Sequence, residues 1–399
     1  MRILVACELP PAALEQLKSL ASVVTYRPDA TTQSLRDIIE DVSILVVGGT
    51  RISPEVVVRA AALQMIVHAG PGPGDLAIEE ASAQGIFITH CPDMHATAVA
   101  ELTFGLILAL DRQIVDIAAA MREGRWTRTE PAAARGLAGR TLGILGYGPV
   151  GERVAQRARA FDMRVVAWCP TLTPNTLRDT EIEFCNWPRE VARMSDVVTV
   201  HETREDEQTT IVDAEFLESM PPGAALVHVG RSGAVDEAAL VEAVEQRNLR
   251  VAIDVFGSEP TGDQVRFRSR LCELPGVVCT PHIGPLTEQA QGAVADEVVR
   301  IVRAFVVSGD VVNCLNLCDR SPATWQLVLR VRDQVGVMAS ILEAVRADGI
   351  NAEEVSSRVF TGAKAAWCTI ALDERPSTEA LDAIRALPDV LHLELRAVV

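Results

Sequence analysis

The 399-residue sequence has no uninterrupted apolar run of the ~20 residues that a membrane-spanning helix requires. The longest candidate, residues 96–110, carries Glu101 and Thr103 and is typical of a buried helix. The N-terminus already has a strand pattern, without a basic region, an apolar core and a cleavage site in series, so we expect no secretory signal. These absences predict a cytoplasmic protein with no membrane partner.

Basic residues are too few to balance the acidic ones, and the formal net charge is −17. This charge argues against a nucleic-acid partner, and it means that an anionic substrate must be held by local cations. The nine cysteines form no C-x-x-C pair, and even the closest two, Cys314 and Cys318, are four residues apart. With no zinc pattern or disulfide framework, we expect reduced thiols and no bound metal.

Short apolar strands alternate with helical stretches in the first 95 residues and again between residues 142 and 280. This alternation predicts an α/β protein with two parallel, Rossmann-like sheets. One long helical segment, residues 96–123, is expected to lead into the second sheet region. The last 75 residues follow the βαββαβ order of a ferredoxin-like domain.

A glycine-rich loop follows the strand that begins at Leu142 and opens a helix: it reads Gly146-Tyr147-Gly148-Pro149-Val150-Gly151. In this context GxGxxG indicates a dinucleotide-binding loop, because its glycines allow a tight turn, close approach of the pyrophosphate and helix–sheet packing. The alternative is an ordinary glycine turn. We expect the cofactor to contact Tyr147, Gly148, Pro149 and Val150.

Three reactive side chains, Arg231, Glu259 and His282, each follow a predicted buried strand. Ligands of open α/β sheets bind beyond the carboxyl ends of the strands, so we expect the three to meet there. His282 is the predicted acid/base, Glu259 its partner, and Arg231 a planar fork for a substrate carboxylate. Taken singly, each could instead be a capping histidine, a surface carboxylate or an ordinary ion-paired arginine.

The order of these motifs resembles the D-isomer-specific 2-hydroxyacid dehydrogenases. After the glycine loop come Gly230-Arg231-Ser232-Gly233, residues 254–260, and Pro281-His282-Ile283-Gly284. Within that family the chain is most similar to phosphoglycerate dehydrogenases that carry a C-terminal ACT domain. The resemblance implies a flavodoxin-like substrate-binding domain (residues 1–97 and 284–320), a dinucleotide-binding domain (98–283) and an ACT-like regulatory domain (325–399).

The resemblance also implies roles for individual residues. Arg231, Glu259 and His282 would be catalytic, with Arg231 and His282 also contacting the substrate. Gly70 and Gly72 would bind the substrate through their backbone. The cofactor site would further include Gly230, Asp254, His282 and His201, although His201 could equally be structural.

The implied activity is an NAD(P)-dependent oxidoreductase acting on the CH–OH group of a 2-hydroxy acid. D-3-phosphoglycerate, oxidised to 3-phosphohydroxypyruvate in serine biosynthesis, is the expected substrate. The alternatives are a hydroxypyruvate or glyoxylate reductase and a non-catalytic dinucleotide-binding sensor. We further expect a homodimer or homotetramer and an amino-acid effector at the ACT-like domain.

Several positions depart from the family pattern. Cys169 takes the place of the acidic residue that binds the adenosine ribose, so NAD is the expected cofactor with NADP as the alternative. The loop at residues 68–75 contains Pro71 and Pro73, which lack backbone donors. Arg51 aligns imperfectly with a phosphate-binding arginine. Finally, three histidines stand where relatives usually have asparagine: His90, His95 and His228.

Overall fold

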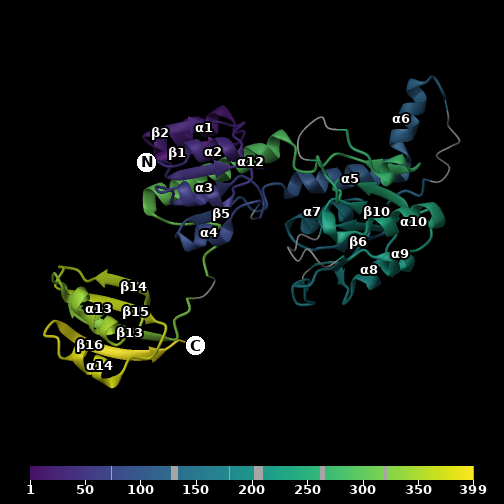
Figure 1. The fold of residues 1–399 in the computed structure, drawn as a ribbon. Helices are drawn as coiled ribbons and strands as arrows, with labels where there is room; N and C mark the ends of the chain where they lie inside the picture. The colour runs from purple at the N-terminus through teal and green to yellow at the C-terminus, as the bar shows by residue number, and fades with distance from the viewer. Residues whose placement is uncertain are drawn as a thin grey trace. The chain divides into compact units, whose positions relative to one another are not determined.

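The computed structural model describes residues 1–72, 74–126, 134–178, 180–201, 210–260, 266–318 and 321–398, so Pro73 of the proline-containing loop lies outside the described residues. The chain divides into two compact units, Met1–Asn316 and Leu317–Val399. The first unit contains a five-stranded and a seven-stranded sheet, and the second a four-stranded sheet (Figure 1). We call the parts built on the first two sheets the first lobe and the second lobe.

The first lobe is a parallel sheet with the flavodoxin-like strand order β2-β1-β3-β4-β5. Its central strands are fully buried, because helices cover both faces of the sheet. Its elements are β1 (Arg2–Ala6), α1 (Pro11–Leu20), β2 (Val23–Tyr26), α2 (Thr32–Ile38), β3 (Ile44–Val47), α3 (Pro54–Arg59), β4 (Met65–His68), α4 (Ile78–Ala83) and β5 (Phe87–His90).

Two helices connect the lobes. α5 (Ala96–Arg112) runs from the first lobe and packs against the second, and α12 (Glu288–Ser308) returns to pack its buried face on α1. In Figure 1, α12 accordingly lies among the elements of the first lobe. The segment predicted as one helix over residues 96–123 is two helices, because Gln113 has φ 52° and ends α5 before α6 (Ile114–Arg122).

The second lobe is an all-parallel sheet with the doubly wound order β12-β11-β10-β9-β6-β7-β8. The strand order reverses between β6 and β9, where dinucleotides bind in this class of fold. Its elements are β6 (Thr141–Leu145), α7 (Pro149–Ala160), β7 (Arg164–Trp168), β8 (Ile182–Phe184), α8 (Pro188–Met194), β9 (Val197–Val200), α9 (Ala214–Ser219), β10 (Ala225–His228), the 3₁₀ turn η2 (Ser232–Ala234), α10 (Glu237–Arg247), β11 (Arg250–Ile253), α11 (Arg270–Glu273) and β12 (Val277–Cys279).

The second unit has the order βαββαβ and an antiparallel sheet arranged β14-β15-β13-β16, which is a ferredoxin-like topology. Alternate residues of β13, including Leu327 and Leu329, pack with Ile341 and Ile384 of the two helices in one core. The elements are β13 (Trp325–Arg332), α13 (Val337–Ala347), β14 (Ala352–Val359), β15 (Ala365–Leu372), α14 (Thr378–Arg385) and β16 (Val390–Ala397).

Within the described ranges, no helix is both long and apolar enough to cross a membrane. The same residues contain no group of three or more histidine, cysteine, aspartate or glutamate side chains placed to share a metal ion.

Candidate active site

A cleft of about 1390 Å³ lies at the carboxyl ends of the second-lobe strands. It gathers segments that are far apart in the sequence, because the carboxyl ends of parallel strands share one edge of the sheet. The catalytic residues predicted from the sequence, Arg231, Glu259 and His282, all line it. Of the predicted cofactor residues, the lining includes Pro149, Val150, His201, Gly230 and Asp254.

His282 and Glu259 form a hydrogen-bonded pair in this cleft. The ring nitrogen Nδ1 of His282 donates to Glu259 Oε2 at 2.8 Å, and the second carboxylate oxygen of Glu259 accepts from the backbone N–H of Phe256 at 2.9 Å. The carboxylate is therefore fixed by its own loop and fixes the imidazole in turn. This leaves Nε2 of His282 as the nitrogen that can exchange a proton with a ligand.

Asp254, the residue after β11, holds the loop that carries His282. Its side chain is buried and accepts hydrogen bonds from Thr280 Oγ1 at 2.5 Å and from the backbone N–H groups of Ile283 and Gly284, each at 2.9 Å. His282 itself has φ 52°, a left-handed conformation that is uncommon outside glycine. The Asp254 carboxylate thus stabilises a backbone turn that places the imidazole in the cleft.

The sequence interpretation placed Asp254 in the cofactor site and assigned nothing to Thr280. The structure shows that both support the His282 loop. For Thr280, the available signal was a polar residue that follows an apolar run and directly precedes Pro281-His282.

The glycine loop has the geometry that a dinucleotide requires. Gly146 has φ 93°, and a Cβ added to Gly151 would lie 2.4 Å from the carbonyl oxygen of Gly146, so both positions need glycine. A Cβ added to Gly148 would meet no atom within 4 Å, so this position opens onto free space. Gly148 caps α7, and Pro149 occupies the first turn, where the missing N–H costs little. These residues fit a pyrophosphate at the start of the helix.

Cys169 follows β7, next to the glycine loop, whose Gly146 N–H donates to the Trp168 carbonyl at 2.9 Å. The Cys169 thiol lies 3.4 Å from Thr171 Oγ1. The position expected to meet the adenosine ribose thus carries a neutral side chain.

His201 directly follows β9 and His228 ends the adjacent strand β10, and both histidines are buried. Neither ring nitrogen of either residue has a hydrogen-bond partner within the described part of the chain. Burial, followed by the neighbouring His228, lowers the pKa of His201 to about 3, and burial, followed by His282, lowers the pKa of His228 to about 4. Both rings are therefore neutral at physiological pH.

The first-lobe wall of the cleft includes Gly72, His90 and His95. Gly70 is not among the residues that line the cleft. A Cβ on Gly70 would lie 2.9 Å from the His68 ring, and its carbonyl accepts from the Cys91 N–H. Of the two glycines predicted to bind substrate, Gly72 therefore lines the cleft, whereas Gly70 packs against the His68 ring.

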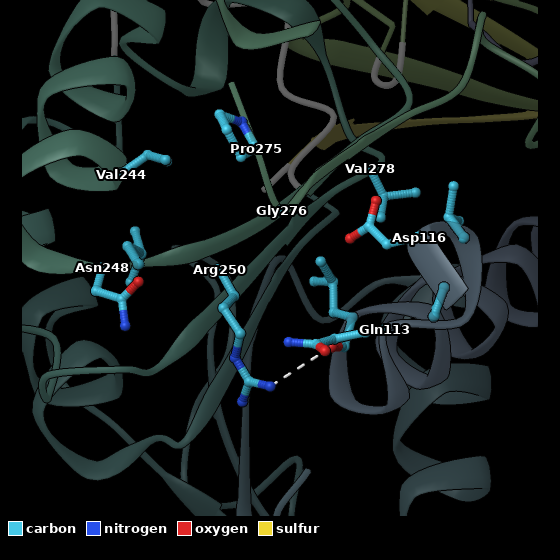
Figure 2. Close-up of a pocket in the computed structure, with 12 residues that line it drawn as sticks. Gln113, Asp116, Val244, Asn248, Arg250, Pro275, Gly276 and Val278 are labelled. Atoms are coloured by element: carbon cyan, nitrogen blue, oxygen red, sulfur yellow. Dashed lines mark hydrogen bonds between the residues drawn. The ribbon is translucent and has the colours of Figure 1, made fainter. Parts of the chain in front are cut away.

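A smaller pocket of about 190 Å³ lies at the opposite, amino edge of the same sheet, where β11 begins (Figure 2). Arg250 reaches across it and donates to the Leu110 carbonyl at 3.5 Å. Its other polar side chains are Gln113, Asp116 and Asn248. It contains none of the residues predicted to be catalytic or to bind cofactor, so the larger cleft is the candidate active site.

Residues 104–284 match the family model described as D-isomer specific 2-hydroxyacid dehydrogenase, NAD binding domain. The chain is 35% identical, over 269 residues, to a hydroxypyruvate reductase of Thermotoga maritima; this match covers 66% of the chain and 85% of that protein. A solved structure of a Thermus thermophilus protein is 32% identical, with a TM-score of 0.69, and the match covers 79% of this chain and 100% of that one. The chain belongs to the D-isomer-specific 2-hydroxyacid dehydrogenases, and its NAD-binding domain is that of the family.

The chain is also 32% identical, over 323 residues, to a D-3-phosphoglycerate dehydrogenase of Methanocaldococcus jannaschii. That match covers 79% of the chain and 60% of the relative, so the chain spans less than two thirds of the relative's length.

Proposed function

We propose that the protein is an NAD(P)-dependent D-2-hydroxyacid dehydrogenase. The observation that carries this proposal is the His282–Glu259 pair, which lies with Arg231 in one cleft at the edge of a sheet whose glycine loop fits a dinucleotide. A proton donor beside a carboxylate-binding cation suits reduction of a 2-keto acid and the reverse oxidation.

When bound, the nicotinamide supplies or accepts the hydride. His282 would donate the proton that neutralises the developing alkoxide, and it would take the hydroxyl proton in the oxidation direction. Glu259 keeps the imidazole oriented, and Asp254 keeps its loop in place. Arg231 would hold the substrate's α-carboxylate beside the reacting carbon.

For the substrate, the geometry favours a small unphosphorylated acid, such as hydroxypyruvate or glyoxylate. Among the described residues lining the cleft, Arg231 is the one arginine and there is no lysine, whereas Asp93 adds a carboxylate to the first-lobe wall. Phosphoryl groups are usually held by additional cations or a backbone nest. A second anionic group would therefore meet little positive charge here.

D-3-phosphoglycerate, the substrate expected from the sequence, remains the second candidate. It is supported by the name of the archaeal relative and by Arg51 as a potential phosphate ligand. Arg51 is exposed, lies 3.6 Å from the Asp75 carboxylate, and is not among the described residues that line the cleft.

A steady-state panel of hydroxypyruvate, glyoxylate and 3-phosphohydroxypyruvate, each with NADH and with NADPH, tests these proposals. We expect turnover of the unphosphorylated acids and little of the phosphorylated one. If 3-phosphohydroxypyruvate is preferred, and Arg51→Ala raises its KM while sparing the other acids, the phosphoglycerate assignment is correct. Binding of NADH without reduction of any acid would instead identify a non-catalytic sensor.

We further propose that residues 325–399, within the unit Leu317–Val399, form an ACT-like regulatory domain that takes an amino-acid effector. We also propose that the protein is a homodimer or homotetramer and that it works in the cytoplasm. The ferredoxin-like strand order supports the first point. Assaying the enzyme with individual amino acids would identify any effector.

A further inference from the structure

Two histidines on neighbouring strands hold a single glycine of the loop between β4 and α4. His68 ends β4, His90 ends β5, and the two are register partners in the sheet. His68 Nδ1 donates to the Gly72 carbonyl at 3.0 Å, and the Gly72 N–H donates to His90 Nδ1 at 3.1 Å. Both backbone groups of Gly72 are therefore bonded to imidazoles.

The hydrogen bonds determine the tautomers of the two rings. A carbonyl only accepts, so His68 must carry its proton on Nδ1, whereas His90 accepts at Nδ1 and must carry its proton on Nε2. Burial is the main cause that lowers the pKa of both rings. His90 is therefore a neutral imidazole with one remaining donor, the Nε2–H.

This arrangement removes donors from the loop itself. The Gly72 N–H is already bonded to His90, and the preceding Pro71 has no N–H. The loop also packs tightly on the His68 ring, since a Cβ on Gly74 would lie 2.8 Å from its Nε2. The two described loop residues that line the cleft, Pro71 and Gly72, therefore offer a ligand no backbone donor.

His95 is a second side chain of this wall, and its imidazole is able to donate a hydrogen bond. It directly precedes α5, lines the cleft, and its Nδ1 is buried with no hydrogen-bond partner in the described ranges. Burial and then the nearby His68 lower its pKa, so it is also neutral. Besides His90 and His95, the described cleft-lining residues of this wall include Pro71, Pro92 and the carboxylate of Asp93.

We propose that His90 and His95 are specificity-determining residues that hold an uncharged oxygen at C3 of the substrate. This inference rests on the proposed dehydrogenase function and narrows its substrate to three-carbon 2-keto or 2-hydroxy acids with a C3 hydroxyl. Arg231 takes the C1 carboxylate from the second lobe, and the neutral imidazoles take the distal hydroxyl. Glyoxylate has no C3 and forgoes this contact.

Two substitutions at His90 separate its two roles. In His90→Asn, the amide oxygen occupies the place of Nδ1 and can still accept from Gly72, but the Nε2–H donor is lost. In His90→Gln, the amide nitrogen reaches the place of Nε2, and the bond to Gly72 is lost. We expect His90→Asn to raise the KM for hydroxypyruvate about tenfold, the effect of one hydrogen bond, with kcat, the KM for glyoxylate and the thermal midpoint nearly unchanged.

His90→Gln should keep the hydroxypyruvate KM closer to wild type, and His95→Asn should act in the same direction as His90→Asn. His392→Asn, at an exposed histidine of β16, is the matched control and should change nothing. Equal KM changes for both acids, or none in His90→Asn, would overturn the proposal.

Failure of the dehydrogenase function itself would be recognised separately, because the wild type would then reduce neither acid. In that case, calorimetric binding of hydroxypyruvate in the presence of NADH, compared between wild type and His90→Asn, still tests the histidine contact. Equal affinities would overturn it.

Discussion

At the scale of single residues, His282 and Glu259 meet in one cleft, because both follow strands whose carboxyl ends a parallel sheet brings to one edge, and their catalytic roles stay a prediction. The sequence did not predict that Asp254 holds the loop of His282. Its three hydrogen bonds go to groups about 30 positions away, and two of these are backbone amides that any residue would supply. Backbone amides occur at nearly every position, so these two contacts leave no pattern in the sequence.

The histidine contacts with Gly72 are a similar case. The sequence shows that His90, His95 and His228 are unusual, but only the backbone path of the loop shows that His90 bonds to Gly72. By contrast, His228 is buried between neighbouring strands and has no hydrogen-bond partner among the described residues. Histidine in place of asparagine thus makes a hydrogen bond to the backbone at position 90 and leaves an unbonded buried ring at position 228.

His228 predicts a specific dependence of stability on pH. Its pKa is about 4 in the folded protein and about 6.5 in the unfolded chain, so between these values only the unfolded chain binds the proton. Proton binding by the unfolded chain lowers the free energy of unfolding. This loss is small above pH 6.5 and grows as the pH falls, reaching about 1.4 kcal/mol at pH 5.5.

Urea unfolding of wild type and His228→Asn at pH 7.5 and pH 5.5 measures this contribution. The free energy of unfolding should fall by about 1.4 kcal/mol less in the variant than in the wild type over this interval. An identical pH dependence in the two proteins would show that His228 can be protonated in the folded state.

At the scale of elements, the alternation of apolar strands with helical stretches predicted the two parallel sheets, because continuous apolar runs such as those of β6, β7 and β9 are a strong signal. The edge strands β2 and β8 give a weaker signal, since Val23–Tyr26 and Ile182–Phe184 are only partly buried. The break between α5 and α6 was missed. It depends on the left-handed conformation of Gln113, a residue that otherwise suits a helix.

Cys169, which follows β7, is expected to influence the choice between NADH and NADPH. Cys169→Asp should raise the ratio of kcat/KM with NADH to kcat/KM with NADPH by about tenfold or more, because a carboxylate can accept from the ribose hydroxyls and repels a 2′-phosphate. Cys169→Ser, which matches cysteine in size without adding charge, is the control and should leave the ratio close to wild type. No change in Cys169→Asp would mean that position 169 does not face the ribose.

At the scale of the whole molecule, the order of four motifs was sufficient to indicate the family, and the matches to known proteins confirm it. The substrate is harder to derive, because it depends on which side chains of two lobes line one cleft. The net charge of −17 makes the local charges of the cleft important, since the overall field repels an acid substrate and Arg231 is the proposed cation that attracts it. Because one arginine faces a strongly negative protein, we favour a substrate acid with one negative charge.

The central claim is that this cleft reduces a 2-keto acid with His282 as the proton donor. Its most direct test is kcat for hydroxypyruvate reduction with NADH in wild type and His282→Ala, with NADH affinity measured by fluorescence titration. We predict measurable wild-type turnover, a decrease in kcat of about 10²–10⁴-fold in the variant, and nearly unchanged NADH affinity. Near wild-type turnover in His282→Ala would contradict the account.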